Sequence, residues 1–188
     1  MMQIDTVAVV GATDEGTICA LVAALAGCAV RVYDGSVAAL ERAFEVVRRR
    51  VELGCAAGAI TRTERQRILD GLLFTPDLDE ALTGADLAVD ATSAPVEDVY
   101  DHLASALRAT AAVAAAGATA AEEIASALPQ PARVLGLALS EAHGPVPRLE
   151  MIAARGTSDH VLERARAFAA RVNRASRTGP RMDPAGSA

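Results

Sequence analysis

The stretch Val7-Ala8-Val9-Val10-Gly11-Ala12-Thr13-Asp14-Glu15-Gly16 decides the fold. Its apolar, valine-rich half predicts a buried strand at Thr6–Val10. The run stops at Gly11, and apolar residues return at helical spacing, which predicts a helix over 15–26. A buried strand joined to a helix by a short glycine turn is typical of the first unit of a parallel α/β sheet.

The turn itself resembles a phosphate-binding turn with one position changed. Gly11 and Gly16 match the outer glycines of G-x-G-x-x-G, which holds the pyrophosphate of a dinucleotide against a helix N-terminus. Thr13 replaces the middle glycine, and Asp14 and Glu15 follow it. Each carboxylate within 4 Å of a phosphate costs about 1–4 kcal/mol in repulsion. We therefore expect Thr13 to close the turn and the acidic pair to stabilise the helix dipole.

The rest of the chain alternates short apolar runs with helical patterns, which predicts a doubly wound, mostly parallel α/β sheet of the Rossmann type. Further strands are predicted at Ala29–Tyr33, Leu72–Thr75, 85–90, 111–116, 134–139 and 149–154. Further helices are predicted at 36–53, 61–69, 77–82, 96–107, 120–128 and 159–172. The stretch from Gly54 to Gly58 is expected to end the long helix, so that helices 36–53 and 61–69 form a helical hairpin inserted after the second strand. We place one domain over residues 1–173 and a flexible tail over 174–188.

Composition excludes several classes of function. A net charge of −6 argues against a nucleic-acid partner, and no apolar run is long enough to cross a membrane. Three cysteines without C-x-x-C spacing, and no signal peptide before the first strand, predict free thiols and a cytoplasmic protein. All 18 basic residues are arginine, so chemistry through a lysine Schiff base is excluded. No metal-ligand spacing is present, and we expect no metal.

The order of these pieces resembles the NAD-binding domain of the 3-hydroxyacyl-CoA dehydrogenases. The likeness runs without gaps from Ile4 to about Val172, and its most distinctive part is the helical hairpin, which ordinary Rossmann domains lack. It is carried by the stretches 7–16, 32–34, 85–91, 133–137, 149–152 and 157–159. The resemblance implies a second, all-helical domain that completes the substrate cleft. We expect either that the protein works without that domain or that a separate chain supplies it.

The resemblance also assigns the family's catalytic positions. It places the catalytic histidine at Ala138, the substrate-binding serine at Gly117 and a glutamate near the nicotinamide ribose at Ala94. The glutamate that orients the histidine is retained as Glu150, and Asp34 stands where an acidic group would bind the adenosine ribose. Loss of the general base together with the serine predicts that this chain is not a competent 3-hydroxyacyl-CoA dehydrogenase.

New polar groups stand where the family's catalytic ones are missing. Glu141 and His143 follow the sixth strand, and with Glu150 they form a candidate acid–base set at the carboxyl ends of the strands. The alternative for Glu141 and His143 is a loop that is merely solvated. The candidate cofactor-binding residues are Gly11, Gly16 and Asp34. We expect no cofactor, with NAD binding possible but weakened.

Three functions remain open. The first is a repurposed enzyme that acts without hydride transfer on a small acyl or polyketide-like molecule, by cyclisation, isomerisation or elimination, because positioning alone lowers a barrier substantially. The second is a non-catalytic binding subunit, and the third is a residual NAD-dependent oxidoreductase. We favour the first. A homodimer is also expected, since a Rossmann domain without its second domain exposes an apolar flank.

Overall fold

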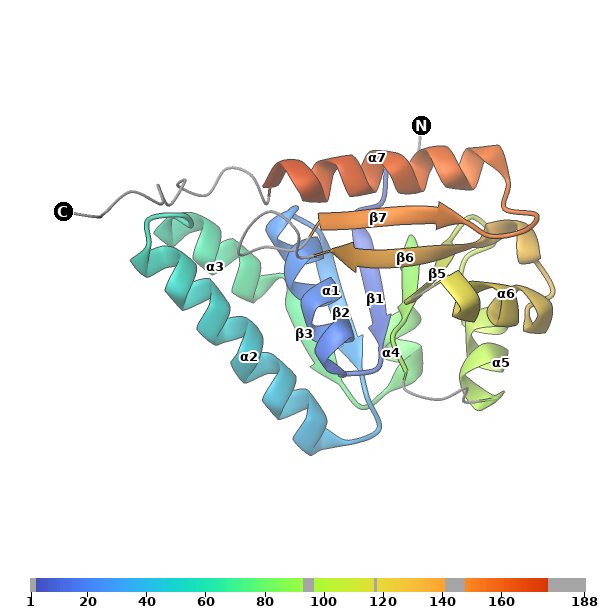
Figure 1. Cartoon of the computed structure of the whole chain (residues 1–188). Helices are drawn as coiled ribbons and strands as arrows, with labels where there is room; N and C mark the ends of the chain where they lie inside the picture. Colours follow the sequence, from blue (N-terminus) through green and yellow to red (C-terminus); the bar gives the residue numbers. More distant parts are fainter. Residues whose placement is uncertain (1–2, 93–96, 117, 141–147, 176–188) are drawn as a thin grey trace.

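The computed structural model describes residues 3–92, 97–116, 118–140 and 148–175. It contains a seven-stranded sheet with the order β3-β2-β1-β4-β5-β6-β7 (Figure 1). Strands β1 to β6 are parallel to one another, and β7 is antiparallel to β6. The predicted mostly parallel, Rossmann-like sheet is confirmed.

The strands are β1 Thr6–Val10, β2 Ala29–Tyr33, β3 Leu72–Thr75, β4 Leu87–Asp90, β5 Ala112–Ala116, β6 Val134–Ser140 and β7 Arg148–Ala153. The α-helices are α1 Asp14–Leu25, α2 Val37–Ala56, α3 Arg62–Asp70, α4 Leu78–Leu82, α5 Glu97–Ala106, α6 Ala118–Ala127 and α7 Asp159–Ala175. The first three strands lie where the sequence predicts them. The other predicted strands and the helices shift by one to three residues at their ends.

The helices divide between the two faces of the sheet. Buried residues of α1, α2, α3 and α7 share one apolar cluster with alternate residues of the strands. Buried residues of α4, α5 and α6 share a second cluster with the intervening strand residues. Alternation of this kind is what a buried parallel strand requires, because its side chains point to opposite faces in turn. The helix α1 is buried nearly all round, and not on one face only, because α2 and α7 both pack against it.

The helical hairpin of α2 and α3 differs from prediction at its turn. Gly54 does not break α2, which continues to Ala56, because the missing Cβ leaves room for the side chain of Ile60. The chain reverses at Gly58, where φ is +72°. Thr61 then forms a capping box with Glu64 at the start of α3. This places the hairpin turn later than the sequence suggests.

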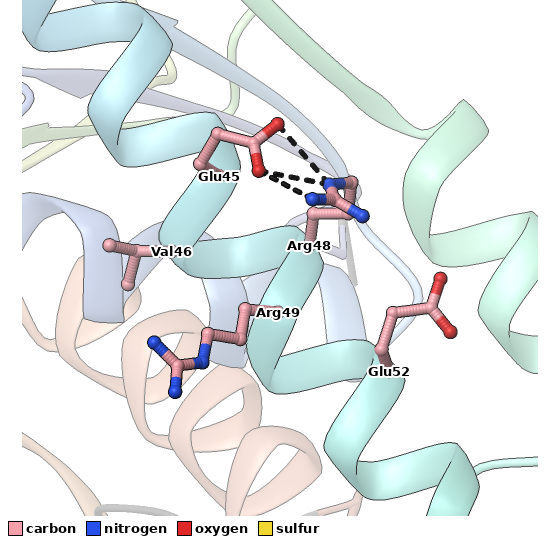
Figure 2. Close-up of a pocket in the computed structure, with 5 residues that line it drawn as sticks. All are labelled: Glu45, Val46, Arg48, Arg49 and Glu52. Atoms are coloured by element: carbon pink, nitrogen blue, oxygen red, sulfur yellow. Dashed lines mark hydrogen bonds and ion pairs between the residues drawn. The ribbon is translucent and has the colours of Figure 1, made fainter.

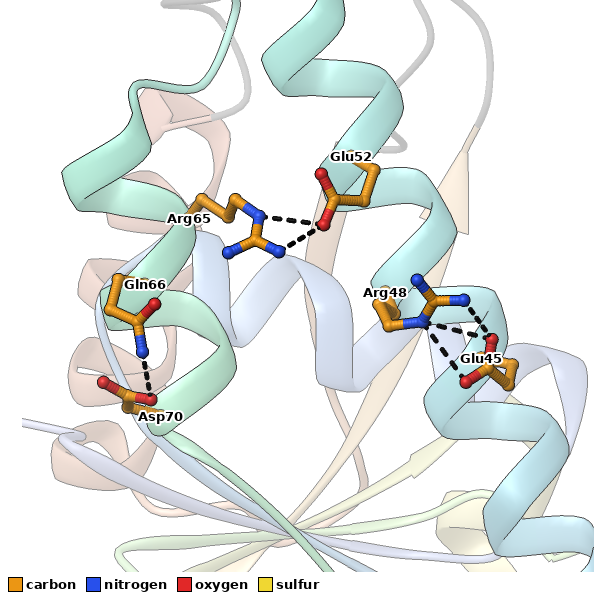
Figure 3. Close-up of polar contacts among 6 residues, drawn as sticks. All are labelled: Glu45, Arg48, Glu52, Arg65, Gln66 and Asp70. Atoms are coloured by element: carbon orange, nitrogen blue, oxygen red, sulfur yellow. Dashed lines mark hydrogen bonds and ion pairs between the residues drawn. The ribbon is translucent and has the colours of Figure 1, made fainter.

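An ion pair ties the two helices of the hairpin together. The guanidinium of Arg65 on α3 binds Glu52 on α2 at 2.5 Å (Figure 3). The other polar contacts in the same view, Arg48 with Glu45 and Gln66 with Asp70, lie within single helices. The exposed arginines 48–50 are solvated, as expected for one turn of a surface helix.

The last helix is three residues longer than predicted. α7 extends to Ala175, and Asn173 is fixed by two hydrogen bonds to the backbone of Leu149 on β7. Asn173 therefore belongs to the folded domain. The remainder of the predicted tail lies outside the described residues.

Candidate functional site

The turn between β1 and α1 lies at the carboxyl edge of the parallel strands, where α/β sheets bind their ligands. Gly11 has a φ of +103°, and a Cβ there would approach the carbonyl oxygen of Ala91 to 2.8 Å. A Cβ on Gly16 would overlap the carbonyl oxygen of Gly11. Both glycines are therefore required by the packing of the turn, as the sequence predicts. Their role toward a cofactor stays a prediction.

Thr13 closes the turn. Its hydroxyl oxygen accepts a hydrogen bond from the Gly16 amide at 3.1 Å, which makes Thr13 the N-cap of α1. The same hydroxyl donates to the carbonyl of Ala91 at 2.9 Å. Thr13 thus joins the start of α1 to the end of β4. A glycine at this position would make neither contact.

Asp34 lies at the end of β2 and is already bound to the backbone. One carboxylate oxygen accepts from the amide of Ala12 at 2.9 Å, and the other accepts from the amide of Ser36 at 2.9 Å. The side chain is only half-buried, and each carboxylate oxygen has a further lone pair for a ribose hydroxyl. The residue therefore fits the adenosine end of a dinucleotide while it also holds the glycine turn.

The pyrophosphate position is less favourable. Among the described residues, none accepts a hydrogen bond from the backbone amides of Asp14 and Glu15, so two donors at the N-terminus of α1 remain open to an anion. The carboxylates of these two residues are exposed in the same first turn. The backbone fits a dinucleotide, and the side chains weaken the fit through repulsion.

A polar cluster that the sequence analysis missed lies at the end of β4. Asp90 is 8% exposed, and one of its oxygens accepts from both the amide and the hydroxyl of Thr92, at 3.0 and 2.7 Å. Its other oxygen accepts from the Tyr100 hydroxyl on α5 at 3.4 Å. Burial, and next the negative charge of Asp90, raise the pKa of Tyr100 to about 12. The phenol is therefore uncharged near neutral pH and donates a hydrogen bond to Asp90.

The two positions to which the resemblance assigns the family's histidine and its orienting glutamate face each other. Glu150 on β7 lies directly opposite Ala138 on β6 in the antiparallel ladder. Directly opposite residues share a face of the sheet, and their Cβ atoms lie about 4.5–5.5 Å apart. Ala138 is half-buried and Glu150 is exposed. A histidine at 138 would be beside Glu150, and in this chain a methyl group takes its place.

The other members of the predicted set cannot be placed. Glu141 and His143 lie outside the described residues, as do Ala94 and Gly117. The structure therefore does not test whether Glu141, His143 and Glu150 meet. Among the residues it describes, no group of three or more His, Cys, Asp or Glu side chains is arranged to hold a metal ion.

The cysteine nearest the turn is chemically quiet. Cys19 on α1 is 3% exposed, and burial, followed by the charge of Glu15, raises its thiol pKa to about 12. A thiol that stays protonated near neutral pH is a poor nucleophile. Cys19 is a core residue, as the sequence predicts.

A shallow hollow lies away from the strand ends, on the outer surface of α2. It encloses about 350 Å³ and is lined by Glu45, Val46, Arg48, Arg49 and Glu52 (Figure 2). Its lining comes from one helix, and Arg48 is engaged by Glu45. The hollow holds no convergent set of polar groups, which a binding site requires. None of the helices in the described part of the chain is long and apolar enough to cross a membrane.

Comparison with known proteins agrees with this architecture. The family model for the NAD-binding domain of 3-hydroxyacyl-CoA dehydrogenase matches residues 6–176. A 3-hydroxybutyryl-CoA dehydrogenase of Mycobacterium tuberculosis is 30% identical over 174 residues, which cover 90% of this chain and 60% of that protein. A 3-hydroxyadipyl-CoA dehydrogenase of Escherichia coli is 36% identical over 97 residues, 52% of this chain and 20% of the relative.

Solved structures give the same result. The crystal structure of M. tuberculosis FadB2 superposes with a TM-score of 0.80 at 29% identity, over 91% of this chain and 61% of the other. The 3-hydroxybutyryl-CoA dehydrogenase of E. coli superposes with a TM-score of 0.83 at 27% identity, over 92% and 37%. The chain spans less than two thirds of the length of these relatives.

The match covers nearly every described element, including the helical hairpin and β7. It is weakly at odds with our expectation that no cofactor binds, because the matched domain is an NAD-binding one. The chain therefore belongs to the family of NAD-binding domains of the 3-hydroxyacyl-CoA dehydrogenases.

Proposed function

We propose that this chain does not transfer hydride and instead acts on a small acyl or polyketide-like molecule at the carboxyl edge of its sheet. The reaction would be a cyclisation, isomerisation or elimination. The observation that carries the proposal is the pairing of Ala138 with Glu150. Without an imidazole at 138, the described site lacks the histidine base to which the resemblance assigns proton removal from a 3-hydroxyl group.

The same pairing supports an acyl-type ligand. The face around Ala138 also carries Gly136, the exposed Glu150 and the exposed Ile152, so small residues of β6 lie beside one carboxylate and one apolar side chain of β7. An acyl chain would pack on the isoleucine and on the small residues of this strip. Glu150, which faces a methyl group at Ala138, would act as the base, and the neutral phenol of Tyr100 would be a second proton-bearing group at this edge of the sheet.

The test combines binding and turnover with 3-hydroxybutyryl-CoA, a probe suggested by the name of a relative. We expect the wild-type chain to bind it saturably in calorimetry and to form no NADH at 340 nm when NAD⁺ is present. Ala138→His should create a measurable rate of NADH formation, because it returns the base beside Glu150. Val37→His places an imidazole on an exposed site at the start of α2 and should create none.

Two results would refute the proposal. NADH formation by the wild-type chain would establish a residual oxidoreductase with a rebuilt site. Absence of saturable binding to the acyl probe would favour a non-catalytic subunit.

A second candidate function, dinucleotide binding, is favoured by the open amides of Asp14 and Glu15 and by the position of Asp34. We propose that NADH binds weakly and that Asp14→Asn/Glu15→Gln tightens binding by about tenfold, since about 1.4 kcal/mol of relieved repulsion corresponds to that factor. NADH fluorescence measures the affinity well, because the chain has no tryptophan. Glu163→Gln, an exposed change on α7, is the matched control. Failure of NADH to saturate either the wild type or the double variant would remove this candidate.

A further inference from the structure

In the described part of the chain, β7 is an edge strand of the sheet, and some of its outward backbone groups have no hydrogen-bond partner. In an antiparallel strand, the amide and carbonyl of one residue point to the same side, and the sides alternate along the strand. Asn173 binds both the amide and the carbonyl of Leu149, each at 2.9 Å. The backbone N–H and C=O of Leu149 therefore point away from β6. The backbone groups of Met151 and Ala153, two and four residues later, point to the same side.

Only some of these outward backbone groups have hydrogen-bond partners. The side-chain amide of Asn173 binds the N–H and the C=O of Leu149, as the backbone of a neighbouring strand would. Within the described part of the chain, no residue binds the outward amides and carbonyls of Met151 and Ala153. The edge is thus closed at its first outward residue and open at the next two. An open edge is a template for pairing with another strand.

The side chains at the open part are suited to association. Ile152 lies between the two open residues, and 38% of its surface is exposed. It is one of the few large apolar side chains left uncovered in the described structure. Its face of the sheet also carries the exposed Glu150, and α7 covers the opposite face. No charge protects the strand at Met151, Ile152 or Ala153.

We propose that two copies of this chain pair through β7, antiparallel, about a two-fold axis at Ile152. Met151 of one copy then lies opposite Ala153 of the other, and Ile152 meets Ile152 across the axis. The two outward pairs form four backbone hydrogen bonds, and the isoleucines form the closer, non-hydrogen-bonded pair between them. The result is one continuous sheet across the dimer with an isologous interface.

The structure disfavours the neighbouring registers. An axis at Leu149, Glu150 or Met151 requires Leu149 to pair, and Asn173 already occupies it. An axis at Glu150 also sets two carboxylates face to face. An axis at Ala153 requires the backbone of Arg155 to pair with the other copy, and its amide already donates a hydrogen bond to Glu122. The axis at Ile152 uses only the open residues.

Charge is compatible with this register as well. Glu150 lies opposite Ala154 of the other copy, four residues from Glu150 of that copy. At about 3.3 Å per residue the two carboxylates are roughly 13 Å apart along the strands. This exceeds the screening length of about 8 Å at physiological salt. The chosen partner, a second copy, therefore offers matching open groups without opposing charges. The inference is independent of the proposed acyl chemistry.

Sedimentation velocity over a range of concentrations tests the proposal. We expect the wild-type chain to dimerise, and Ile152→Lys and Ile152→Glu each to be monomeric, because each places two like charges at the axis. An equimolar mixture of the two variants should dimerise again, since lysine then meets glutamate. Only an interface in which residue 152 meets its own copy predicts this rescue by mixing.

Val37→Lys is the control, because Val37 is the more exposed residue at 57% and lies on α2. It should leave dimerisation unchanged, and circular dichroism should show that all variants are folded. A wild type that stays monomeric at concentrations 100-fold above those of a typical assay would overturn the proposal. Pairing of β7 with a strand of a different protein would overturn it as well. A dimer that Ile152→Lys leaves intact would place the interface elsewhere.

Discussion

Thr13 shows how one side chain can change the use of a turn. Its hydroxyl takes the amide of Gly16 and reaches the carbonyl of Ala91, so the helix start and the end of β4 are held by one residue. The middle glycine of the family's motif lets a phosphate approach the backbone, whereas this threonine serves the fold. Threonine at this position therefore adds two hydrogen bonds to the local structure of the turn.

Removing that hydroxyl should destabilise the domain. Thr13→Ala loses an N-cap and a bond to β4, and we expect it to lower the free energy of unfolding by about 1–2 kcal/mol. Thr13→Ser keeps the hydroxyl and should stay within about 0.5 kcal/mol of wild type. Urea unfolding followed by circular dichroism measures both. Equal stability of the two variants would contradict the assigned role.

Tyr100 predicts a dependence on alkaline pH. Its pKa is raised to about 12 by burial and by Asp90, above the ordinary value of 10. A group whose pKa is raised in the folded state contributes stability below its ordinary pKa and loses it as pH rises toward the folded value. The contribution should therefore be complete below pH 10 and disappear between pH 10 and about 12.

Absorbance at 295 nm follows this ionisation directly, because the chain has two tyrosines and no tryptophan. We expect a phenol that ionises near pH 12 in the wild type and is missing from Tyr100→Phe. Asp90→Asn should lower that midpoint, since it removes the negative charge. A wild-type titration identical to that of Tyr100→Phe would show that the phenol is not held as described.

At the scale of elements, α7 and β7 form a unit joined by Asn173. Packing of α7 on the sheet comes from buried side chains such as Phe168 and Val172. The amide of Asn173 adds two hydrogen bonds at the strand edge, where no further strand of the described chain pairs. An element near the end of the domain thus limits how much of the edge remains open.

Asn173→Leu should loosen this unit. The variant leaves the amide and carbonyl of Leu149 without their partner, which costs about 1–3 kcal/mol when such groups stay shielded from water. Hydrogen exchange at the Leu149 amide should accelerate relative to wild type. Arg174→Leu, an exposed change one residue later, should not accelerate it. Unchanged exchange in Asn173→Leu would argue against the two hydrogen bonds.

At the scale of the whole molecule, the three cysteines differ in solvent exposure. Cys19 and Cys28 are 3% and 5% exposed, and burial raises the pKa of both thiols. Cys55 at the end of α2 is only half-buried. The chain therefore contains its own probe of global unfolding.

A thiol reagent at neutral pH should modify one cysteine quickly and two slowly. The fast phase belongs to Cys55, because it alone is accessible without opening the core, and Cys55→Ser should abolish it. In denaturant all three thiols should react at one rate. Fast modification of two cysteines in the native protein would mean that the core around α1 and β2 opens locally.

The sequence by itself determined the class of the fold and much of its layout. Short, mainly apolar runs of four or five residues define β1, β2 and β3, because strands of a parallel sheet covered by helices are largely buried. Gly11 and Gly16 were also readable, since their spacing requires a tight turn and close helix packing. The assignment of Ala138 to the position of the family histidine rests on a local motif and stays a prediction.

Tertiary structure alone decided which distant groups meet. Asp90 and Tyr100 belong to different elements, and no local pattern indicates that α5 places a phenol on that carboxylate. Gly54 stays helical because Ile60 fills the space beside it, although glycine by itself disfavours a helix. The sequence places Asn173 at the end of the domain without indicating a partner, and the docking of α7 brings it to Leu149. Local propensity and periodicity are properties of neighbouring residues, whereas these contacts depend on how the layers pack, and only the folded chain fixes that.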